Sequence, residues 1–109
     1  MATTADYIKF VCEQIAGMGA VRYRKMFGEY MVYVNDKPLL LVCDNTVYVK
    51  MLPELAPLMA RADTGLPYKG GREHYILDIE DRALTLAALA ILEPLTPRPK
   101  PRKKKGAII

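Results

Sequence analysis

The stretch that most constrains the fold is Val21–Lys50, where short runs of β-branched and aromatic residues alternate with tight-turn sequences. The runs Tyr30–Val34, Leu39–Cys43 and Val47–Lys50 have the composition of strands. The sequences between them contain asparagine and aspartate, which tolerate the backbone angles of tight turns. Because short turns join antiparallel neighbours, the stretch predicts an antiparallel meander that begins with a first strand at Val21.

The rest of the chain predicts three helices and one more strand. Apolar residues recur at helical spacing in Asp6–Ala16, and Asp81–Leu92 reads as a nearly all-apolar helix capped by Asp81 that must be covered on most sides. Pro53–Ala62 also has a helical pattern, although Pro57 requires it to be short, kinked or restarted. His74–Ile79 predicts the last strand, after a loop of about 11 residues.

These elements predict a single α+β domain with an antiparallel sheet and flanking helices, in the order α-β-β-β-β-α-β-α. Thr3 and Asp6 form a variant of the capping box at the start of the first helix. Gly28 permits a turn or bulge after the first strand. Leu39–Cys43 is apolar on both faces, which predicts a central strand covered by helices.

The charge divides the chain into two parts. The formal net charge is +4, yet residues 1–95 hold 10 basic and 12 acidic side chains. We therefore predict a mildly acidic folded domain over residues 1–95 and a disordered, proline-rich basic tail over residues 96–109. The tail is a candidate contact for a polyanion such as nucleic acid, or simply a solubilising terminus. Its six cations are Arg98, Lys100, Arg102, Lys103, Lys104 and Lys105.

The location predicted from the sequence is the cytoplasm. The N-terminus has neither the basic nor the apolar region of a signal peptide, and the longest apolar run, Ala83–Leu92, is too short to span a membrane. No membrane association is expected. Cys12 and Cys43 each lie in an apolar segment, which predicts buried free thiols; the alternative is a disulfide joining helix to sheet.

No recognisable catalytic set is present, so the sequence predicts a protein that is not an enzyme and has no cofactor or metal. Serine is absent and His74 is the only histidine, which leaves no serine nucleophile and no ordinary histidine metal site. Lys69–Arg72 is basic and glycine-rich but lacks the full phosphate-loop pattern. Asp78, Glu80 and Asp81 are the densest acidic group, with no fourth ligand for magnesium.

Basic and aromatic residues are interleaved in and beside the first two strands of the meander. This combination suits nucleic-acid or protein contacts, and the alternative is a solvated strand beside core tyrosines. Two further cations lie on the long loop that precedes the last strand. The candidate interaction residues are Arg22, Arg24, Lys25, Tyr30, Tyr33, Lys69 and Arg72.

The meander carries a family resemblance. Arg-Lys-Met-Phe-Gly-Glu-Tyr at Arg24–Tyr30, followed by Tyr33, Lys37-Pro38 and Val47–Lys50, resembles the N-terminal domain of the TfoX/Sxy family, named for regulators of DNA-uptake competence. Glu29, Met31 and Asp36 stand where that family often has glycine. The resemblance implies a small α+β domain and a non-enzymatic module that binds protein or DNA-associated machinery. Family regulators generally carry a second, helical C-terminal domain, whereas this chain continues into the basic tail.

Three functional hypotheses follow. The first is a stand-alone TfoX-like regulatory or interaction domain whose contact surfaces are the Arg22–Tyr33 hairpin and the basic tail. In this hypothesis the domain binds a protein partner, and the tail contacts nucleic acid. The second is a small anionic-ligand-binding domain or enzyme that uses the Leu66–His74 loop, with Tyr68, Lys69, Arg72 and His74 around the ligand. The third is a structural homodimer that associates through a sheet edge or the apolar last helix.

Overall fold

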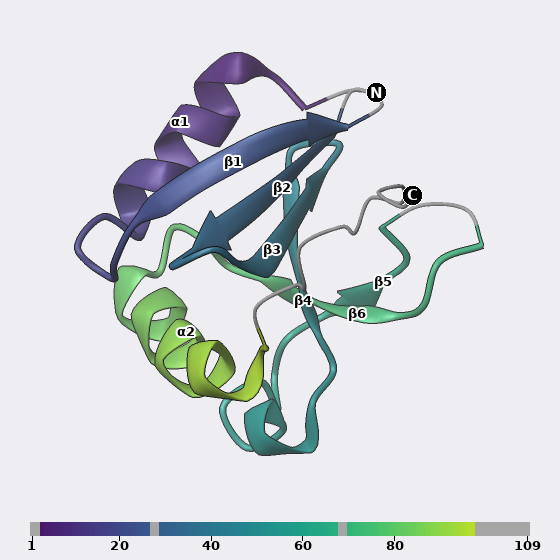
Figure 1. The fold of residues 1–109 in the computed structure, drawn as a ribbon. Coiled ribbons are helices and arrows are strands. Elements are labelled where there is room, and N and C mark those ends of the chain that lie inside the picture. The colour runs from purple at the N-terminus through teal and green to yellow at the C-terminus, as the bar shows by residue number, and fades with distance from the viewer. Residues whose placement is uncertain (1–2, 27–28, 68–69, 98–109) are drawn as a thin grey trace, which may run out of the picture.

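Six strands form one antiparallel sheet in the order β1-β2-β3-β4-β6-β5 in the computed structural model, which describes residues 3–26, 29–67 and 70–97 (Figure 1). This confirms the predicted α+β class. The sheet lies beside two α-helices, both at the left of the view in Figure 1. The elements are α1 (Ala5–Gln14), β1 (Val21–Met26), β2 (Glu29–Val34), β3 (Lys37–Cys43), β4 (Thr46–Lys50), a 3-10 helix η1 (Pro53–Leu55), β5 (Thr64–Gly65), β6 (His74–Leu77) and α2 (Arg82–Leu95).

The predicted meander is confirmed, and its turns have a local cause. Asn35 and Asp36, between β2 and β3, have φ angles of 53° and 66°. Asp44 and Asn45, between β3 and β4, have φ angles of 51° and 54°. Two consecutive left-handed residues form the two-residue hairpin turn whose twist matches that of the strands, and asparagine and aspartate tolerate this conformation. Asp36 therefore takes the left-handed conformation that a hairpin glycine would adopt.

The core lies between the two helices and one face of the sheet. Burial alternates along β2, where Tyr30, Val32 and Val34 are buried. Their side chains share a face with their register partners on the neighbouring strands, because directly paired residues point to the same side. The core residues from these strands and from the helices are Ile8, Val11, Ile15, Tyr30, Val32, Val34, Leu40, Val42, Val47, Val49, Leu77, Ala88, Leu89 and Leu92.

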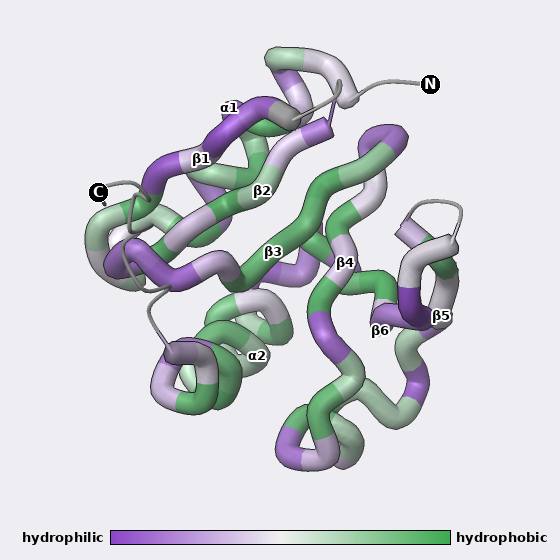
Figure 2. The backbone as a smooth tube through the Cα atoms, turned by 45° about the vertical axis from the view of Figure 1, so that its right-hand side comes forward, coloured by the Kyte–Doolittle hydropathy of each residue, from purple (hydrophilic) through white to green (hydrophobic). Residues whose placement is uncertain are grey.

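The prediction that helices cover β3 is wrong for one face of this strand. β3 is central, as predicted, but Leu41 points away from the helices and is only partly buried. Figure 2 shows the contrast along the sheet, with hydrophobic residues along β3 and hydrophilic ones along β1. A register shift opposite Val32 and Tyr33 lets both Leu39 and Leu40 be buried in succession. A bulge of this kind removes the alternation that normally reveals a one-sided strand.

The ends of the two helices differ from prediction by a few residues. Thr4, not Thr3, caps α1, since its side chain accepts a hydrogen bond from the Tyr7 amide at 3.1 Å. The predicted cap of α2 is confirmed, because Asp81 accepts from the Leu84 amide at 3.0 Å. α2 continues to Leu95 rather than Leu92, with Pro94 in its final turn.

The outer side of α2 is exposed, so the prediction that this helix must be covered on most sides is wrong. Thr85, Ala88, Leu89 and Leu92 are its buried residues. The exposed positions include three alanines, whose methyl groups cost little when they face water. These alanines are Ala83, Ala87 and Ala90.

The segment predicted as the middle helix is short. Only Pro53–Leu55 is helical, and turns follow it. Pro57 has no amide hydrogen to donate to the Pro53 carbonyl, which instead accepts from Ala56 at 3.1 Å. The sequence also missed β5, which pairs Thr64 with Tyr75 of β6. A two-residue strand has no periodicity that a sequence pattern could reveal.

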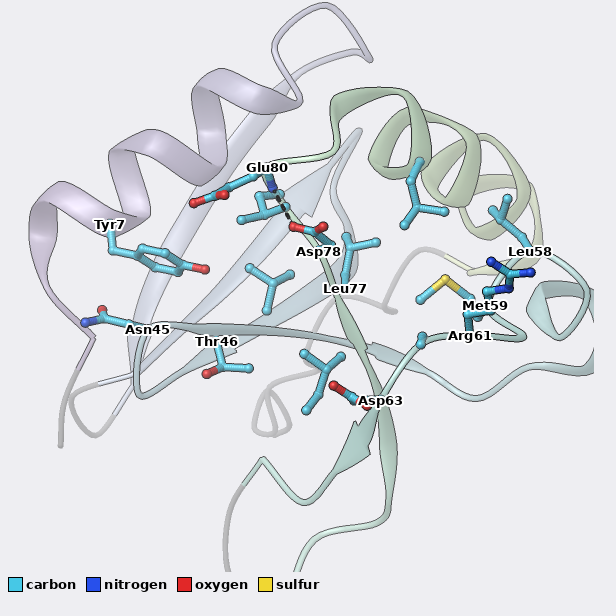
Figure 3. A pocket seen from close by; sticks show the side chains of 15 residues that line it. Tyr7, Asn45, Thr46, Leu58, Met59, Arg61, Asp63, Leu77, Asp78 and Glu80 are labelled. Carbon is cyan, nitrogen blue, oxygen red and sulfur yellow. Dashed lines mark hydrogen bonds between the residues drawn. The ribbon is translucent and has the colours of Figure 1, made fainter.

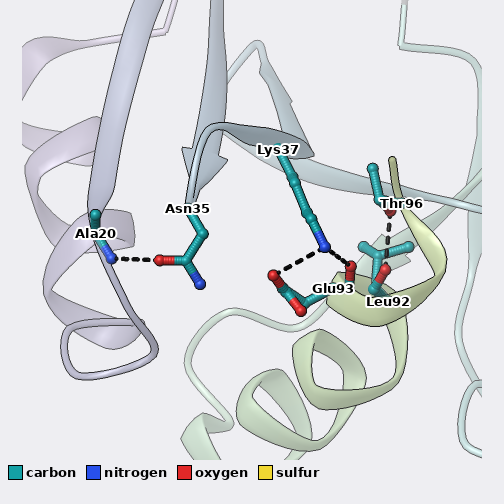
Figure 4. Close-up of polar contacts among 6 residues, drawn as sticks. All are labelled: Ala20, Asn35, Lys37, Leu92, Glu93 and Thr96. Carbon is teal, nitrogen blue, oxygen red and sulfur yellow. Dashed lines mark hydrogen bonds and ion pairs between the residues drawn. The ribbon is translucent and has the colours of Figure 1, made fainter. Parts of the chain in front are cut away.

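Polar contacts fix both helices to the sheet. The Lys37 ammonium donates to the Glu93 backbone carbonyl at 3.0 Å and lies 3.1 Å from the Glu93 carboxylate (Figure 4). At the other end of α2, the Arg82 guanidinium donates to the Gln14 carbonyl at the end of α1 at 3.2 Å. The Gln14 side chain in turn donates to the Ile79 carbonyl at 2.8 Å. These bonds hold the helices on one face and leave the other face open.

Candidate functional site

The face of the sheet opposite the helices is the candidate site, and we call it the open sheet face. Its central row is defined by the register of five strands, in which Arg24 pairs with Met31, Met31 with Leu41, Leu41 with Tyr48, and Tyr48 with Ile76. Paired residues lie side by side on the same face. The open sheet face comprises Arg22, Arg24, Met31, Tyr33, Leu41, Tyr48, Lys50, His74 and Ile76.

The middle of the open sheet face is apolar and its ends are basic. Met31, Leu41 and Ile76 are partly buried although both helices pack on the other side. Arg24 is exposed at the β1 end of the row, and Lys50 is exposed where β4 leaves the sheet. An apolar centre with a charged rim is the usual composition of a protein interface.

A small opening interrupts this face where β3 and β4 diverge. Their pairing ends at Leu41 and Tyr48, although both strands continue. A cavity of about 50 Å³ lies there, lined by Met31, Leu41 and Tyr48 and closed below by Leu92 of α2. A volume of this size accepts a methyl or methylene group, so the opening can seat the end of one aliphatic side chain.

The aromatic rings of the open sheet face already have partners. The Arg22 guanidinium lies 4.2 Å from the centroid of the Tyr33 ring. Arg22 also forms an exposed ion pair with Asp36 at 3.3 Å. The Tyr48 and His74 rings meet edge to face with centroids 6.4 Å apart. Arg22 thus occupies one ring face of Tyr33 on which a nucleobase would stack, which makes this surface a poorer platform for bases.

The structure separates the residues that the sequence grouped as interaction candidates. Arg22, Arg24 and Tyr33 lie together on the open sheet face. Tyr30 is 7% exposed and belongs to the core, and its register partner Lys25 is therefore on the helix side of β1. A strand presents alternate residues to opposite faces, so one contiguous run cannot form one surface.

The sequence missed the apolar centre of the surface. Met31, Leu41, Tyr48 and Ile76 come from four different strands, and only the register brings them into one row. The two-residue turns could have revealed that Leu41 and Tyr48 pair, because a tight hairpin sets the register of its strands. The β4–β6 pairing has no comparable local signal.

The described part of the Leu66–His74 loop gives little support to the hypothesis of an anionic-ligand site. Arg72 is exposed, and its carbonyl oxygen lies 2.7 Å from Nδ1 of His74. His74 belongs to the open sheet face, where it contacts Tyr48. Tyr68 and Lys69 lie outside the described residues, and so do the six cations of the tail.

The neighbouring acidic residues Asp78, Glu80 and Asp81 have two different roles in the structure. Asp81 caps α2, whereas Asp78 and Glu80 line a pocket beside α1. Within residues 3–26, 29–67 and 70–97, the structure places no three histidine, cysteine or acidic side chains together as a metal site. In the same part of the chain, no helix has the length and apolar character needed to cross a membrane.

Both cysteines are free thiols, as predicted, but only Cys43 is fully buried. Burial raises the pKa of the Cys43 thiol to about 11, and the nearby carboxylates Glu29 and Asp44 contribute.

Since the thiolate is the reactive form, we expect iodoacetamide at pH 8 to modify Cys43 at least about 100-fold more slowly in the folded protein than in urea. Mass spectrometry of timed samples measures the rate, and Cys12, which is partly exposed, serves as the internal comparison. Equal rates in the folded and unfolded states would contradict the buried thiol.

The sheet edges bear on the homodimer hypothesis. β1 is one edge and carries Arg22, Arg24 and Lys25 on a six-residue strand. If two β1 strands paired in antiparallel fashion, cations of the two copies would be brought side by side, which is a common device against edge-to-edge association. β5, the other edge, has only two residues. Neither edge therefore offers a long uncharged strand for pairing.

Comparison with known proteins agrees with the fold and with the meander motif. The model of the TfoX N-terminal domain matches residues 13–90, which run from the end of α1 into α2. The chain belongs to the TfoX N-terminal domain family. It is also similar to the uncharacterized 12.7 kDa protein in the trpE 5'region of Spirochaeta aurantia, with 34% identity over 107 residues that cover 96% of this chain and 93% of that protein.

Three residues of this chain stand where the TfoX N-terminal domain family often has glycine, and the structure shows what each of them contacts or which conformation it takes. Asp36 takes the left-handed turn conformation. The Glu29 carboxylate accepts hydrogen bonds from the Thr3 hydroxyl at 2.8 Å and the Asp44 amide at 3.0 Å, and so ties the start of the chain to the β3–β4 turn. Met31 contributes to the apolar centre of the open sheet face and lines its small cavity.

Proposed function

We propose that this TfoX N-terminal domain is a non-enzymatic regulatory module that binds an acidic protein partner through the open sheet face. The observation that carries the proposal is the row from Arg24 to Ile76, in which apolar side chains of four strands follow Arg24 of β1 on the side that the helices leave uncovered. Exposed cations lie at the rim of this face, namely Arg22 and Arg24 on β1 and Lys50 at the end of β4. A protein surface with acidic and aliphatic side chains complements both features.

Two features favour protein over single-stranded nucleic acid at this face. Arg22 occupies one face of the Tyr33 ring at 4.2 Å, and His74 contacts the Tyr48 ring. The centre of the row is aliphatic, and aliphatic side chains do not stack with bases. The cavity beside Leu41 instead matches an aliphatic anchor of the kind that often dominates protein interfaces.

The test uses charge reversal on opposite faces of one strand. We expect the double variant Arg22→Glu and Arg24→Glu to bind the partner at least about tenfold more weakly, because it reverses the charge at the rim of the interface. Lys25→Glu is the matched control, since Lys25 is exposed on the same strand but lies on the helix side. This control should bind within about twofold of the unmodified protein.

The partner is found by photo-crosslinking of the full chain in cells. Benzoylphenylalanine at Tyr48 places the probe on the open sheet face, and the same amino acid at the exposed Lys9 of α1 places it on the other side. The proposal expects a crosslink from position 48 to an acidic protein, present in the Lys25→Glu background and absent in the Arg22→Glu, Arg24→Glu background. Affinities are then measured with that purified partner. Equal crosslinking in both backgrounds, or crosslinking to nucleic acid, would refute the proposal.

The basic tail is the second candidate contact surface, because residues 96–109 carry six cations and no acid. Fluorescence anisotropy with duplex DNA at several salt concentrations tests it in the full chain. Replacing Lys103, Lys104 and Lys105 with glutamine should weaken binding and reduce its salt dependence, since each phosphate contact releases counterions. Binding that is unchanged by these substitutions would exclude a role for the tail lysines in DNA binding.

A further inference from the structure

A second candidate site lies mainly on the helix side of the sheet, and Ile76 is the residue that it shares with the open sheet face. It is a cavity of about 660 Å³, within the range of small-molecule pockets (Figure 3). Tyr7 of α1 borders it on one side, and the turn segment with Leu58, Met59 and Arg61 borders it on the other. Four separate segments of the chain therefore meet around it: α1, the start of β4, the segment after η1, and the connection from β6 to α2.

The floor of this cavity is apolar. Val47 and Leu77 are register partners whose side chains point to the helix side, and they are 1% and 3% exposed. Met59 and Ile79 are 2% and 4% exposed and also line it. A floor of this kind favours ligands with an aliphatic stem, because apolar area on both partners leaves water.

The mouth of the cavity is acidic. Asp63, Asp78 and Glu80 line it and are exposed, and Arg61 is the only cation among the lining residues. Within the described ranges, no ion pair joins Arg61 or any other cation to these carboxylates. Asp78 accepts a hydrogen bond from the Glu80 amide at 3.3 Å, which holds the two carboxylates on one turn.

The carboxylates at the mouth of the cavity influence the ionisation of the Tyr7 hydroxyl. Burial raises the pKa of the Tyr7 hydroxyl, and Glu80 and Asp78 raise it further. The phenol therefore stays protonated near neutral pH, with its ring directed toward the cavity (Figure 3). A neutral aromatic ring beside two carboxylates attracts an organic cation, both through the charges and through its electron-rich face.

We propose that this cavity binds a small alkylammonium compound, with the ammonium group between Asp78, Glu80 and Tyr7 and the aliphatic stem on the floor formed by Val47 and Leu77. The combination of an acidic mouth and an apolar floor decides the class of ligand. An inorganic cation would gain nothing from the apolar floor, and an anion would meet three carboxylates. Apart from Ile76, this site shares no residue with the open sheet face, which carries the opposite charge.

Isothermal titration with the full chain tests the site, with n-pentylamine as the probe. We expect a dissociation constant of about 0.1–1 mM, as suits a small ligand in a partly open site. Pentanol and pentanoate, which share the stem but lack the ammonium, should bind at least about tenfold more weakly. Amide chemical-shift changes should fall on Tyr7, Thr46 and Leu77 and spare Leu41 on the open sheet face. Absence of binding at 10 mM n-pentylamine, or shift changes outside the cavity, would overturn the proposal.

Charge removal gives a matched pair of variants. Asp78→Asn with Glu80→Gln keeps the shape of the mouth and the acceptor for the Glu80 amide, and it should weaken n-pentylamine binding at least about fivefold. Glu13→Gln with Glu54→Gln removes the same charge from exposed positions outside the cavity and should leave binding unchanged. Equal weakening by both pairs would reduce the effect to net charge and contradict a site.

One more probe distinguishes a free alkylamine from the lysine side chain of a peptide as the ligand. N-acetyl-lysine N-methylamide carries the same ammonium and stem on a peptide backbone. Weaker binding than n-pentylamine identifies a free amine as the ligand, and equal or tighter binding identifies a lysine side chain of a peptide. Failure to bind either probe would refute the site while leaving the proposal for the open sheet face intact.

Discussion

Replacing Leu89 with alanine is expected to destabilise the domain by about 3–5 kcal/mol, the upper part of the range for buried leucines. Leu89 is 0% exposed and lies on the face of α2 that packs against the sheet. Its removal deletes buried apolar area and leaves a cavity that neighbours anchored in the sheet cannot close. Urea unfolding followed by circular dichroism measures the free energy of unfolding.

Leu95→Ala is the matched control for this prediction. Leu95 lies on the same helix but is 44% exposed, so the identical chemical change should cost less than about 1 kcal/mol. A similar loss in both variants would show that helix propensity, rather than core packing, governs the effect. Such a result would contradict the placement of Leu89 against the sheet.

Replacing Gly19 with alanine is expected to cost about 2–3 kcal/mol. Gly19 has a φ angle of +145°, which side-chain-bearing residues rarely adopt. A methyl group there would also lie 2.5 Å from Oδ1 of Asn35. That oxygen accepts a hydrogen bond from the backbone amide of Ala20 at 3.0 Å (Figure 4). The backbone amide of Asn35 donates to the Ala20 carbonyl at 2.8 Å. The substitution therefore adds backbone strain and breaks the contact that joins the start of β1 to the β2–β3 turn.

The variant Gly17→Ala separates the cost of backbone strain from the cost of breaking the Asn35 contact. The φ angle of Gly17 is +97°, yet a methyl group at this position would meet nothing within 4 Å. Gly17→Ala should therefore cost only the backbone strain, about 1 kcal/mol, partly offset by a less flexible unfolded chain. Thermal unfolding of both variants gives the comparison. Equal destabilisation would mean that the Asn35 contact contributes nothing.

Much of the fold followed from residues whose preferences act locally. The turn residues at Asn35-Asp36 and Asp44-Asn45 take left-handed angles, and they place three strands in antiparallel order without help from the rest of the chain. Asp81 caps α2 through a bond three residues away. Pro57 limits the middle helix through its own missing amide hydrogen. Each of these effects spans about four residues, so a sequence pattern can record it.

The candidate site was predicted only in part, because strand alternation and long-range pairing decide which side chains share a surface. Arg22, Arg24 and Tyr33 were found through their residue types. Tyr30 was misplaced, since a core tyrosine and a surface tyrosine look alike in a sequence. The pocket beside Tyr7 draws on residues as far apart as Tyr7 and Leu84, and no local pattern joins them.

The sequence by itself determined the α+β class, the meander of Val21–Lys50 with its two tight turns, and the resemblance to the TfoX N-terminal domain. Only the tertiary structure decided that both helices cover the same face of the sheet, that β4 pairs with β6 as well as with β3, and that a basic-edged apolar strip remains open. The reason is physical. Backbone preferences act between neighbours in the chain, whereas the choice of face depends on which side chains of distant segments leave water together.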